Sequence, residues 1–252
     1  MCLILLAYQQ HPKYKLILIA NRDEFHNRPT EKAHWWQDRN SEFLAGKDLE
    51  GNGSWLGINR HGKFAALTNY RDPFNVKKNA PTRGHLVTNY LESRQDDITY
   101  LDSLERCKNS YNGYNLLFGD ANQINYYSNY HKSMMSLEAG IYGLSNALLD
   151  TPWPKVIKGK EKLKRLIENE NDFSVESAFK NLCDTALAED NVLPDTGIGY
   201  EREKAISSMF IETNGYGTRC STIILVDYDN KVSFHEKSYI PEGYVSSDFE
   251  IK

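Results

Sequence analysis

The sequence lacks the features that mark membrane, secreted and nucleic-acid-binding proteins. No stretch of it approaches the ~20 uninterrupted apolar residues that a membrane span requires. The opening MCLILLA is apolar, but it has no basic segment before it and runs directly into QQHPKYK, which is not typical of a signal peptide. The net charge of -4 provides no basic field for nucleic acid. We therefore expect no nucleic-acid partner and no integral membrane association.

Cysteine is also scarce. The four cysteines, Cys2, Cys107, Cys183 and Cys220, lie far apart, and neither a CxxC motif nor a Cys/His ligand spacing is present. This pattern argues against a structural zinc site, a covalently attached haem and a disulfide scaffold. We expect no bound metal, and a reducing, cytoplasmic compartment.

Paired strand signals, separated by short turn-like segments, are frequent in this sequence. They join residues 2–8 with 15–21, 55–59 with 64–70, 114–119 with 124–128, and 222–228 with 232–237. Strand pairs near both ends of the chain, with helices between them, differ from the regular strand–helix–strand alternation of a doubly wound fold. The sequence predicts an α+β protein of antiparallel sheets covered by helices, with residues 1–252 forming one domain.

Helical periodicity is present in three places. The segment 152–170 places Val156, Ile157, Leu163, Leu166 and Ile167 near one face, and Pro154 suits a first turn. The segment 174–189 begins with a capping serine and carries apolar residues at helical spacing, namely Val175, Phe179, Leu182, Cys183 and Ala186. A pair of helices is expected over about 84–106, and a long loop over 190–200.

The main chemical signal is Cys2, directly behind the initiator methionine. Removal of Met1 makes this cysteine the first residue, with a nucleophilic thiol and an α-amine whose pKa is about 7.7–8.0. That amine can take the thiol proton, so no separate histidine is needed. The sequence therefore allows an N-terminal cysteine nucleophile, although a free cysteine is more often a small buried hydrophobe.

The strand after Cys2 returns polar residues to it. A hairpin of residues 2–8 with 14–21 brings the following Asn-Arg-Asp-Glu run beside Cys2. Arg22 would lower the thiol pKa, and Asp23 would hold or orient the amine. Strand alternation places Asn21 and Asp23 on one face and Arg22 and Glu24 on the other. The alternative is that Arg22 and Asp23 form only an ion pair that stabilises the turn.

Short motifs along residues 1–222 carry a family resemblance. They are MCLI, ANRDEF, GSWLGIN, ALTNYR, RG-L at 83–86, GLSNALLDTPWPK and YGTRCST. Together they resemble the NRDE family, also called the transport and Golgi organization family. That family is similar to the N-terminal nucleophile (Ntn) hydrolases, and above all to the choloylglycine hydrolase and penicillin V acylase group. The resemblance implies an αββα four-layer sandwich of antiparallel sheets.

The resemblance also implies a set of site residues. Cys2 corresponds to the nucleophile, Asn69 and Asn146 to two asparagines near the oxyanion, and Arg219 to a later arginine.

This sequence departs from the acylase pattern after the first strand. The acylases have an arginine, two further residues and then an aspartate, a spacing that here falls on Asn21 and Glu24. Either these two residues replace the pair, or Arg22 and Asp23 do its work with the help of a local bulge. We favour Arg22 and Asp23.

Two functions follow from the resemblance. The first is an amidohydrolase or acyl-transfer enzyme in which Cys2 attacks an amide or thioester of a hydrophobic acyl substrate, with no cofactor required. Trp35 and Trp36 would then form a pocket rim or simply pack onto the sheet.

The second function is a non-catalytic carrier that uses the same pocket, for haem or for an acyl-CoA or lipid. Cys2 would then be available as a thiolate ligand. Seven histidines could include a haem ligand, but none lies in a ligand pattern and most are expected to be loop or surface residues, namely among His11, His26, His34, His61, His85, His131 and His235.

Overall fold

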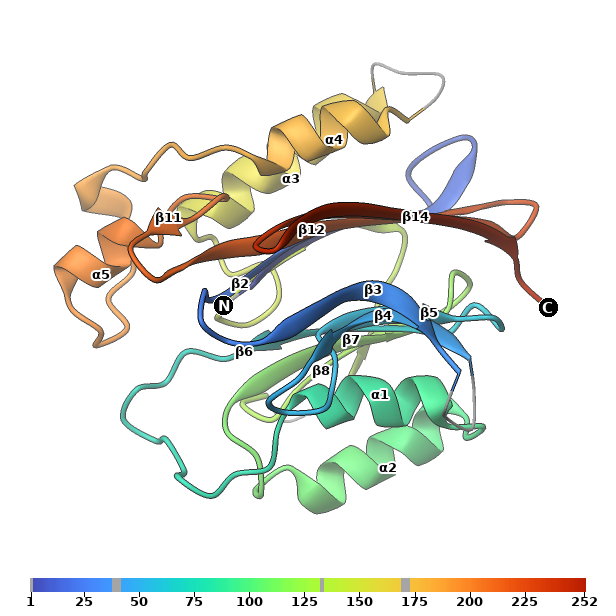
Figure 1. Cartoon of the computed structure of the whole chain (residues 1–252), viewed down its shortest axis with the longest axis horizontal. Coiled ribbons are helices and arrows are strands. Elements are labelled where there is room, and N and C mark those ends of the chain that lie inside the picture. The colour runs from blue at the N-terminus through green and yellow to red at the C-terminus, as the bar shows by residue number, and fades with distance from the viewer. Residues whose placement is uncertain (1, 38–41, 132–133, 169–172) are drawn as a thin grey trace.

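The computed structural model describes residues 2–37, 42–131, 134–168 and 173–252. Two sheets face each other, and helices cover the outer side of each sheet (Figure 1). The arrangement is the four-layer αββα sandwich implied by the sequence motifs, and the strands of both sheets pair antiparallel.

The first sheet contains both ends of the chain. Its strands run in the order β10-β1-β2-β12-β13-β14, with a short β11 (Glu212–Thr213) beside β12. Their bounds are β1 Cys2–Tyr8, β2 Tyr14–Phe25, β10 Gly140–Leu144, β12 Tyr216–Asp227, β13 Lys231–Tyr239 and β14 Glu242–Glu250.

The second sheet is a meander in chain order from β3 to β9. Its strands are β3 Thr30–Trp36, β4 Phe43–Asp48, β5 Leu56–Asn59, β6 Phe64–Asn69, β7 Tyr114–Gly119, β8 Ile124–Ser128 and β9 Met135–Ser136. The four expected hairpins, β1–β2, β5–β6, β7–β8 and β12–β13, are all confirmed.

Helices α1 (Gly84–Glu92) and α2 (Asp97–Cys107) cover the second sheet, as expected. Helices α3 (Pro154–Glu168) and α4 (Val175–Leu182) cover the first sheet, and α5 (Tyr200–Ala205) lies beyond them along the chain. Ser174 caps α4 by accepting a hydrogen bond from the Ser177 amide. No helix within the described residues is both long and apolar enough to cross a membrane.

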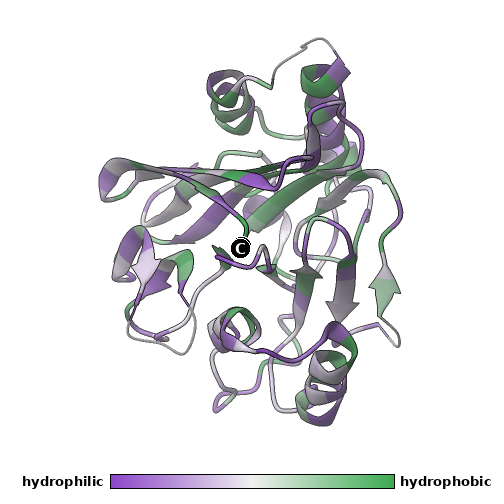
Figure 2. Ribbon diagram, turned by 90° about the vertical axis from the view of Figure 1, so that its right-hand side faces the viewer, coloured by the Kyte–Doolittle hydropathy of each residue, from purple (hydrophilic) through white to green (hydrophobic). Residues whose placement is uncertain are grey.

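Strand alternation divides the core between the layers. In β1, Ile4 and Leu6 face the second sheet, whereas Leu3 and Leu5 face α3 and α4. Figure 2 shows both hydrophilic and hydrophobic colours on the outer helices, as expected where one side meets a sheet and the other meets water. The same alternation decides which side chains of β2 can face Cys2.

Three details of the helical prediction are wrong. Ile157 is 46% exposed, and the buried face of α3 instead includes Lys155 and Gly159. A Cβ at Gly159 would lie 2.8 Å from Leu5 side-chain atoms, so a larger residue at this position would have to displace the Leu5 side chain. Helix α4 ends at Leu182, which leaves Cys183 exposed and Ala186 outside the helix. The expected loop over 190–200 is irregular apart from a short 3₁₀ turn at Asp190–Val192, and it ends at Tyr200, where α5 begins.

Candidate active site

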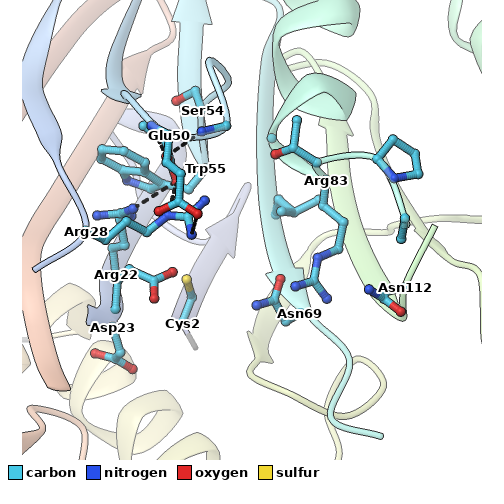
Figure 3. A pocket seen from close by; sticks show the side chains of 18 residues that line it. Cys2, Arg22, Asp23, Arg28, Glu50, Ser54, Trp55, Asn69, Arg83 and Asn112 are labelled. Atoms are coloured by element: carbon cyan, nitrogen blue, oxygen red, sulfur yellow. Dashed lines mark hydrogen bonds and ion pairs between the residues drawn. The ribbon is translucent and has the colours of Figure 1, made fainter. Parts of the chain in front are cut away.

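Cys2 begins β1 at the edge of a cavity of about 410 Å³. The first sheet supplies Cys2, Arg22 and Asp23 to this cavity, while Asn69 and Arg83 project from the wall opposite Cys2 (Figure 3). Residues from both layers of the sandwich thus line one cavity around Cys2, which is half-buried.

The strand register places the polar run of β2 beside the thiol. Cys2 pairs directly with Arg22, and Arg22 pairs on its other side with Cys220 of β12. Directly opposite residues share a face of the sheet, so Cys2 and Arg22 both point toward the second sheet. Asn21 and Asp23 leave the opposite face, which confirms the alternation expected from the sequence.

The surroundings of Cys2 disfavour its thiolate form. Burial and the charge of Asp23 raise the pKa of the thiol, while the charge of Arg22 and a hydrogen bond from the Asp23 backbone act in the opposite direction. The expected lowering by Arg22 is therefore present but outweighed. The Cys2 carbonyl accepts a hydrogen bond of 3.0 Å from the Ser145 hydroxyl, which ties the start of β1 to the segment after β10.

Arg22 is held in place on three sides. Its guanidinium donates to the Thr30 hydroxyl at 3.2 Å and forms an ion pair of 3.4 Å with Asp48. It also lies 4.1 Å from the ring centre of Trp55, as a cation over an aromatic face. Arg28 contacts the same Asp48 carboxylate at 2.6 Å. Burial raises the pKa of Asp48, but the hydrogen bonds and charges around it outweigh burial and hold that pKa below its ordinary value.

Asp23 lies deeper than Arg22, under α3. Its carboxylate accepts a hydrogen bond of 2.7 Å from the Thr218 hydroxyl, and burial raises its pKa despite the charge of Lys155. Lys155 is itself buried, its ammonium donates to the Ile206 carbonyl at 3.3 Å, and burial lowers its pKa. The sequence did not single out Lys155. The only available signal was its place in the PWPK motif, at the start of an otherwise amphipathic helix.

The two asparagines have different placements. Asn69 ends β6 and lines the cavity, where its side chain faces the side of Cys2 (Figure 3). Asn146 is buried and donates through its side chain to the Asn69 backbone carbonyl at 2.8 Å. Asn146 does not line the cavity, so its amide supports the residue that does.

Arg219 points away from the cavity. It is the extra residue of a bulge in β12, between the pairs Thr218–Asp23 and Cys220–Arg22. Its guanidinium donates to three backbone carbonyls, those of Ile240 at 2.8 Å, Phe25 at 2.6 Å and Arg28 at 2.9 Å. The bulge lies in β12, whereas the bulge considered from the sequence was in the NRDE strand.

The alternative pair, Asn21 and Glu24, is split between the two faces of β2. Asn21 donates to the Leu182 and Met209 carbonyls and accepts from the Ser221 hydroxyl at 2.6 Å, so its whole amide is used under the helices. Glu24 lines the rim of the cavity. Arg22, Asp23 and Glu24 all line the cavity, whereas Asn21 does not, and of these only Arg22 is the direct cross-strand partner of Cys2.

Two tryptophans and a second cysteine lie outside the site. Trp36 is buried against Phe43 and donates to the Ala45 carbonyl, and Trp35 packs on Phe249, so both pack onto the sheets and neither lines the cavity. Cys220 is two strands from Cys2, about 10 Å at ~4.8 Å per strand, which is too far for a disulfide. Among the described residues, no group of three or more His, Cys, Asp or Glu side chains is arranged to hold a metal.

Sequence reasoning did not single out two arginines of the cavity. Arg28 follows β2 and pairs with both Asp48 and Glu50. Arg83 immediately precedes α1 and belongs to the RG-L motif, whose presence was noted without a role. Both come from segments that only the packing of the two sheets brings to Cys2.

Comparison with known proteins agrees with the motif pattern. The sequence model of the family described as "Transport and Golgi organisation 2" matches residues 1–241. The human transport and Golgi organization protein 2 homolog is 38% identical over 258 residues, which cover 94% of this chain and 93% of the human protein. The Drosophila melanogaster protein of the same name is 29% identical over 283 residues, with 99% of each chain covered.

Two solved structures share the fold at low sequence identity. A conjugated bile acid hydrolase from Clostridium perfringens has a TM-score of 0.54 and 9% identity, and covers 99% of this chain and 92% of its own. An N-acylethanolamine-hydrolyzing acid amidase ortholog from Caenorhabditis elegans has a TM-score of 0.54 and 12% identity, with 89% and 92% covered. These similarities establish the fold, that of Ntn hydrolases.

Proposed function

This chain belongs to the Transport and Golgi organisation 2 family, and from that premise and the cavity at Cys2 we propose that it is an Ntn-type cysteine amidohydrolase. The observation that carries the proposal is the half-buried Cys2 thiol, which heads β1 and shares one cavity with Arg22 and Asn69. Two neighbours in fold are named as hydrolases, one of conjugated bile acids and one of N-acylethanolamines.

The first half of the proposed reaction acylates the cysteine. Removal of Met1 exposes the α-amine of Cys2, which takes the proton from the thiol as sulfur attacks the substrate carbonyl carbon. An S–C bond forms, and the negative charge that develops on the carbonyl oxygen is stabilised by the Asn69 side-chain amide. The C–N bond then breaks, and the proton on the α-amine passes to the leaving nitrogen.

The second half releases the acyl group. Water attacks the thioester carbon while the α-amine accepts its proton, and the C–S bond breaks to give a carboxylic acid. The proton then returns to sulfur, so the sum is an amide plus water giving an acid plus an amine. The α-amine thus acts as the base in both halves of the cycle.

Turnover tests the proposal directly. We would incubate the purified protein with N-acyl derivatives of 7-amino-4-methylcoumarin, one series with plain acyl chains of increasing length and one with a carboxylate close to the amide, and follow the fluorescence of the released amine. Release that is lost in Cys2→Ala and unaffected in Cys183→Ala supports the proposal. Equal release by the Cys2→Ala variant, or none by a protein that has lost Met1, contradicts it.

A second candidate function is a carrier, and a specific groove favours it. A hollow of about 1180 Å³ lies between α4 and the β13–β14 hairpin. Phe179, Tyr239 and Tyr244 supply apolar surface there, and the charged side chains of Lys180, Lys237, Glu176 and Glu242 lie around it. An amphiphile such as haem or a fatty acyl chain with a charged head combines an apolar body with a polar end, as this lining does.

His235 in this groove is already engaged. Its ring nitrogens contact the Ser233 hydroxyl at 3.1 Å and the Tyr244 hydroxyl at 2.8 Å, so neither nitrogen is free to bind haem iron without losing a hydrogen bond.

Haem titration followed by absorbance separates the two functions. A carrier retains binding in Cys2→Ala and loses affinity in Lys237→Glu, whereas equal binding by Lys237→Glu excludes this groove.

A further inference from the structure

The cavity at Cys2 is polar rather than hydrophobic. Of its 18 lining residues only a few are apolar, namely Trp55, Leu67, Ala80 and Pro81. The Trp55 ring is already covered by the Arg22 guanidinium at 4.1 Å. The one aromatic face of the cavity therefore has limited area for an acyl chain or ring, and polar groups dominate substrate recognition here.

The arginines of the cavity differ in how their charge is balanced. Arg22 and Arg28 both pair with Asp48, at 3.4 and 2.6 Å, and Arg28 also pairs with Glu50. Arg83 makes one hydrogen bond, from one terminal nitrogen to the Gly113 carbonyl at 2.8 Å. Within the described part of the chain, no carboxylate lies at ion-pair distance from Arg83.

The backbone of Arg83 is fixed in place by close packing. A Cβ on Gly53 would lie 2.8 Å from the Gly84 Cα, so the start of α1 sits directly against this turn. The Ser54 amide donates to the Gly84 carbonyl at 3.2 Å, which fixes the contact. The guanidinium is therefore presented to the cavity from a rigid support, on the wall opposite Cys2 (Figure 3).

We propose that Arg83 selects substrates with an anionic group, a carboxylate or a similar oxyanion, close to the bond that Cys2 attacks. A guanidinium presents five N–H donors in a planar fork that matches a carboxylate. The Gly113 carbonyl uses one of these donors. The charge of Glu24 acts on Arg83 from beyond ion-pair distance, and an anionic substrate provides the direct contact that no carboxylate of the described residues makes.

This inference rests on the proposed function only in using the Cys2 thiol as the reacting group. It goes beyond that function because it assigns the substrate class and the residue that recognises it. Burial lowers the pKa of Arg83, in keeping with a guanidinium that no protein carboxylate compensates at contact distance. The guanidinium still remains charged at any working pH, so the selection does not depend on titration.

The test uses two thiol reagents that differ only in charge. Iodoacetate and iodoacetamide both alkylate a thiolate with loss of iodide, but iodoacetate carries a carboxylate where the other carries an amide. We would measure both rates at Cys2 by peptide mass spectrometry, with glutathione as the unbound reference. The iodoacetate-to-iodoacetamide rate ratio at Cys2 is expected to exceed that of glutathione by about tenfold.

Variants assign the effect to Arg83. Arg83→Gln is expected to reduce the ratio to near the glutathione value. Its iodoacetamide rate should stay within about twofold of that of the unchanged protein, which indicates that the site is still folded. Arg60→Gln is the matched control, because Arg60 pairs with Glu42 and lies over Trp35, outside the cavity. A glutathione-like ratio in the unchanged protein overturns the inference, as does a high ratio that persists in Arg83→Gln.

The outcome is separable from that of the proposed function. A high ratio that requires Arg83, in a protein that releases no amine from any acyl substrate, supports anion selection and contradicts hydrolysis. Amine release that depends on Cys2, with a glutathione-like ratio, supports hydrolysis and contradicts anion selection.

Discussion

Cys2 and Arg22 are direct cross-strand partners in the β1–β2 ladder, so the thiol and the guanidinium leave the same face of the first sheet. The positive charge nevertheless does not produce a resting thiolate, because burial of Cys2 has the larger effect on its pKa. Arg22 also forms an ion pair with Asp48 and a cation–π contact with the Trp55 ring. A protonated thiol at rest fits a mechanism in which the α-amine of the same residue acts as the base.

The first prediction concerns the pH dependence of Cys2 alkylation. In protein made without methionine aminopeptidase, so that Met1 is retained, the midpoint of the iodoacetamide rate is expected above the ~8.5 of a free cysteine. The sign follows from the raised pKa: at any pH below it, a smaller fraction of the thiol is ionised than in a free thiol. Arg22→Gln should move the midpoint higher, because a nearby positive charge is lost. A midpoint at or below that of glutathione contradicts this assignment.

The second prediction separates Asn69 from Asn146. Asn69→Ala is expected to slow formation of the acyl adduct on Cys2 by about 10²–10³-fold with little change in stability, because it removes an oxyanion donor. Asn146→Ala should reduce stability by about 1–3 kcal/mol, because the Asn69 carbonyl loses its partner. Stopped-flow acylation and urea unfolding measure the two effects. Equal losses of rate and stability in both variants would contradict the division.

The third prediction assigns Asn21 to the scaffold. In Asn21→Ala, the Leu182 and Met209 carbonyls and the Ser221 hydroxyl lose their hydrogen bonds to the Asn21 side-chain amide. The free energy of unfolding should fall by at least about 2 kcal/mol. The alkylation rate of Cys2 in the folded fraction should stay within about twofold, because Asn21 faces away from the thiol. Urea unfolding and peptide mapping provide the two readouts, and a lost rate at unchanged stability would instead place Asn21 in the reaction.

The fourth prediction concerns Arg219. Arg219→Gln should destabilise the fold by about 2 kcal/mol or more, since the Ile240, Phe25 and Arg28 carbonyls lose a charged donor. Arg219→Lys should recover only part of this loss, because one ammonium cannot reproduce the fork geometry. Thermal unfolding measures both variants. Unchanged stability in Arg219→Gln together with lost acylation would assign Arg219 to the reaction instead.

Sequence analysis identified the strands whose signal, an apolar run next to a turn, lies within one short stretch of the chain. The β1–β2 pair combines two apolar runs with a short turn, and its register then brings Arg22 to Cys2. By contrast, β14 at the edge of the first sheet alternates between exposed and half-buried residues and has no apolar run to indicate a strand. In α3, Lys155 is buried, whereas Ile157, which the apolar pattern placed on the buried face, is exposed.

The candidate site is predictable to a similar degree. Cys2, Arg22 and Asp23 are close in the chain or joined by one hairpin, so their meeting follows from strand geometry. The place of Arg83 depends on how α1 packs against the second sheet, a contact between distant segments that periodicity does not encode. The orientation of Arg219 depends on a one-residue bulge in β12, and a single inserted residue changes the face on which a side chain lies.

The central claim is that Cys2 becomes an N-terminal nucleophile, and intact mass tests it most directly. The protein is purified from the organism in which it occurs, and its intact mass is measured before and after incubation with a thiol-reactive β-lactam. The Cys2→Ala variant is measured in parallel as the control. The account predicts loss of Met1 and one covalent adduct, absent from the Cys2→Ala control. Retention of Met1, or no adduct on a protein that has lost it, would contradict the account.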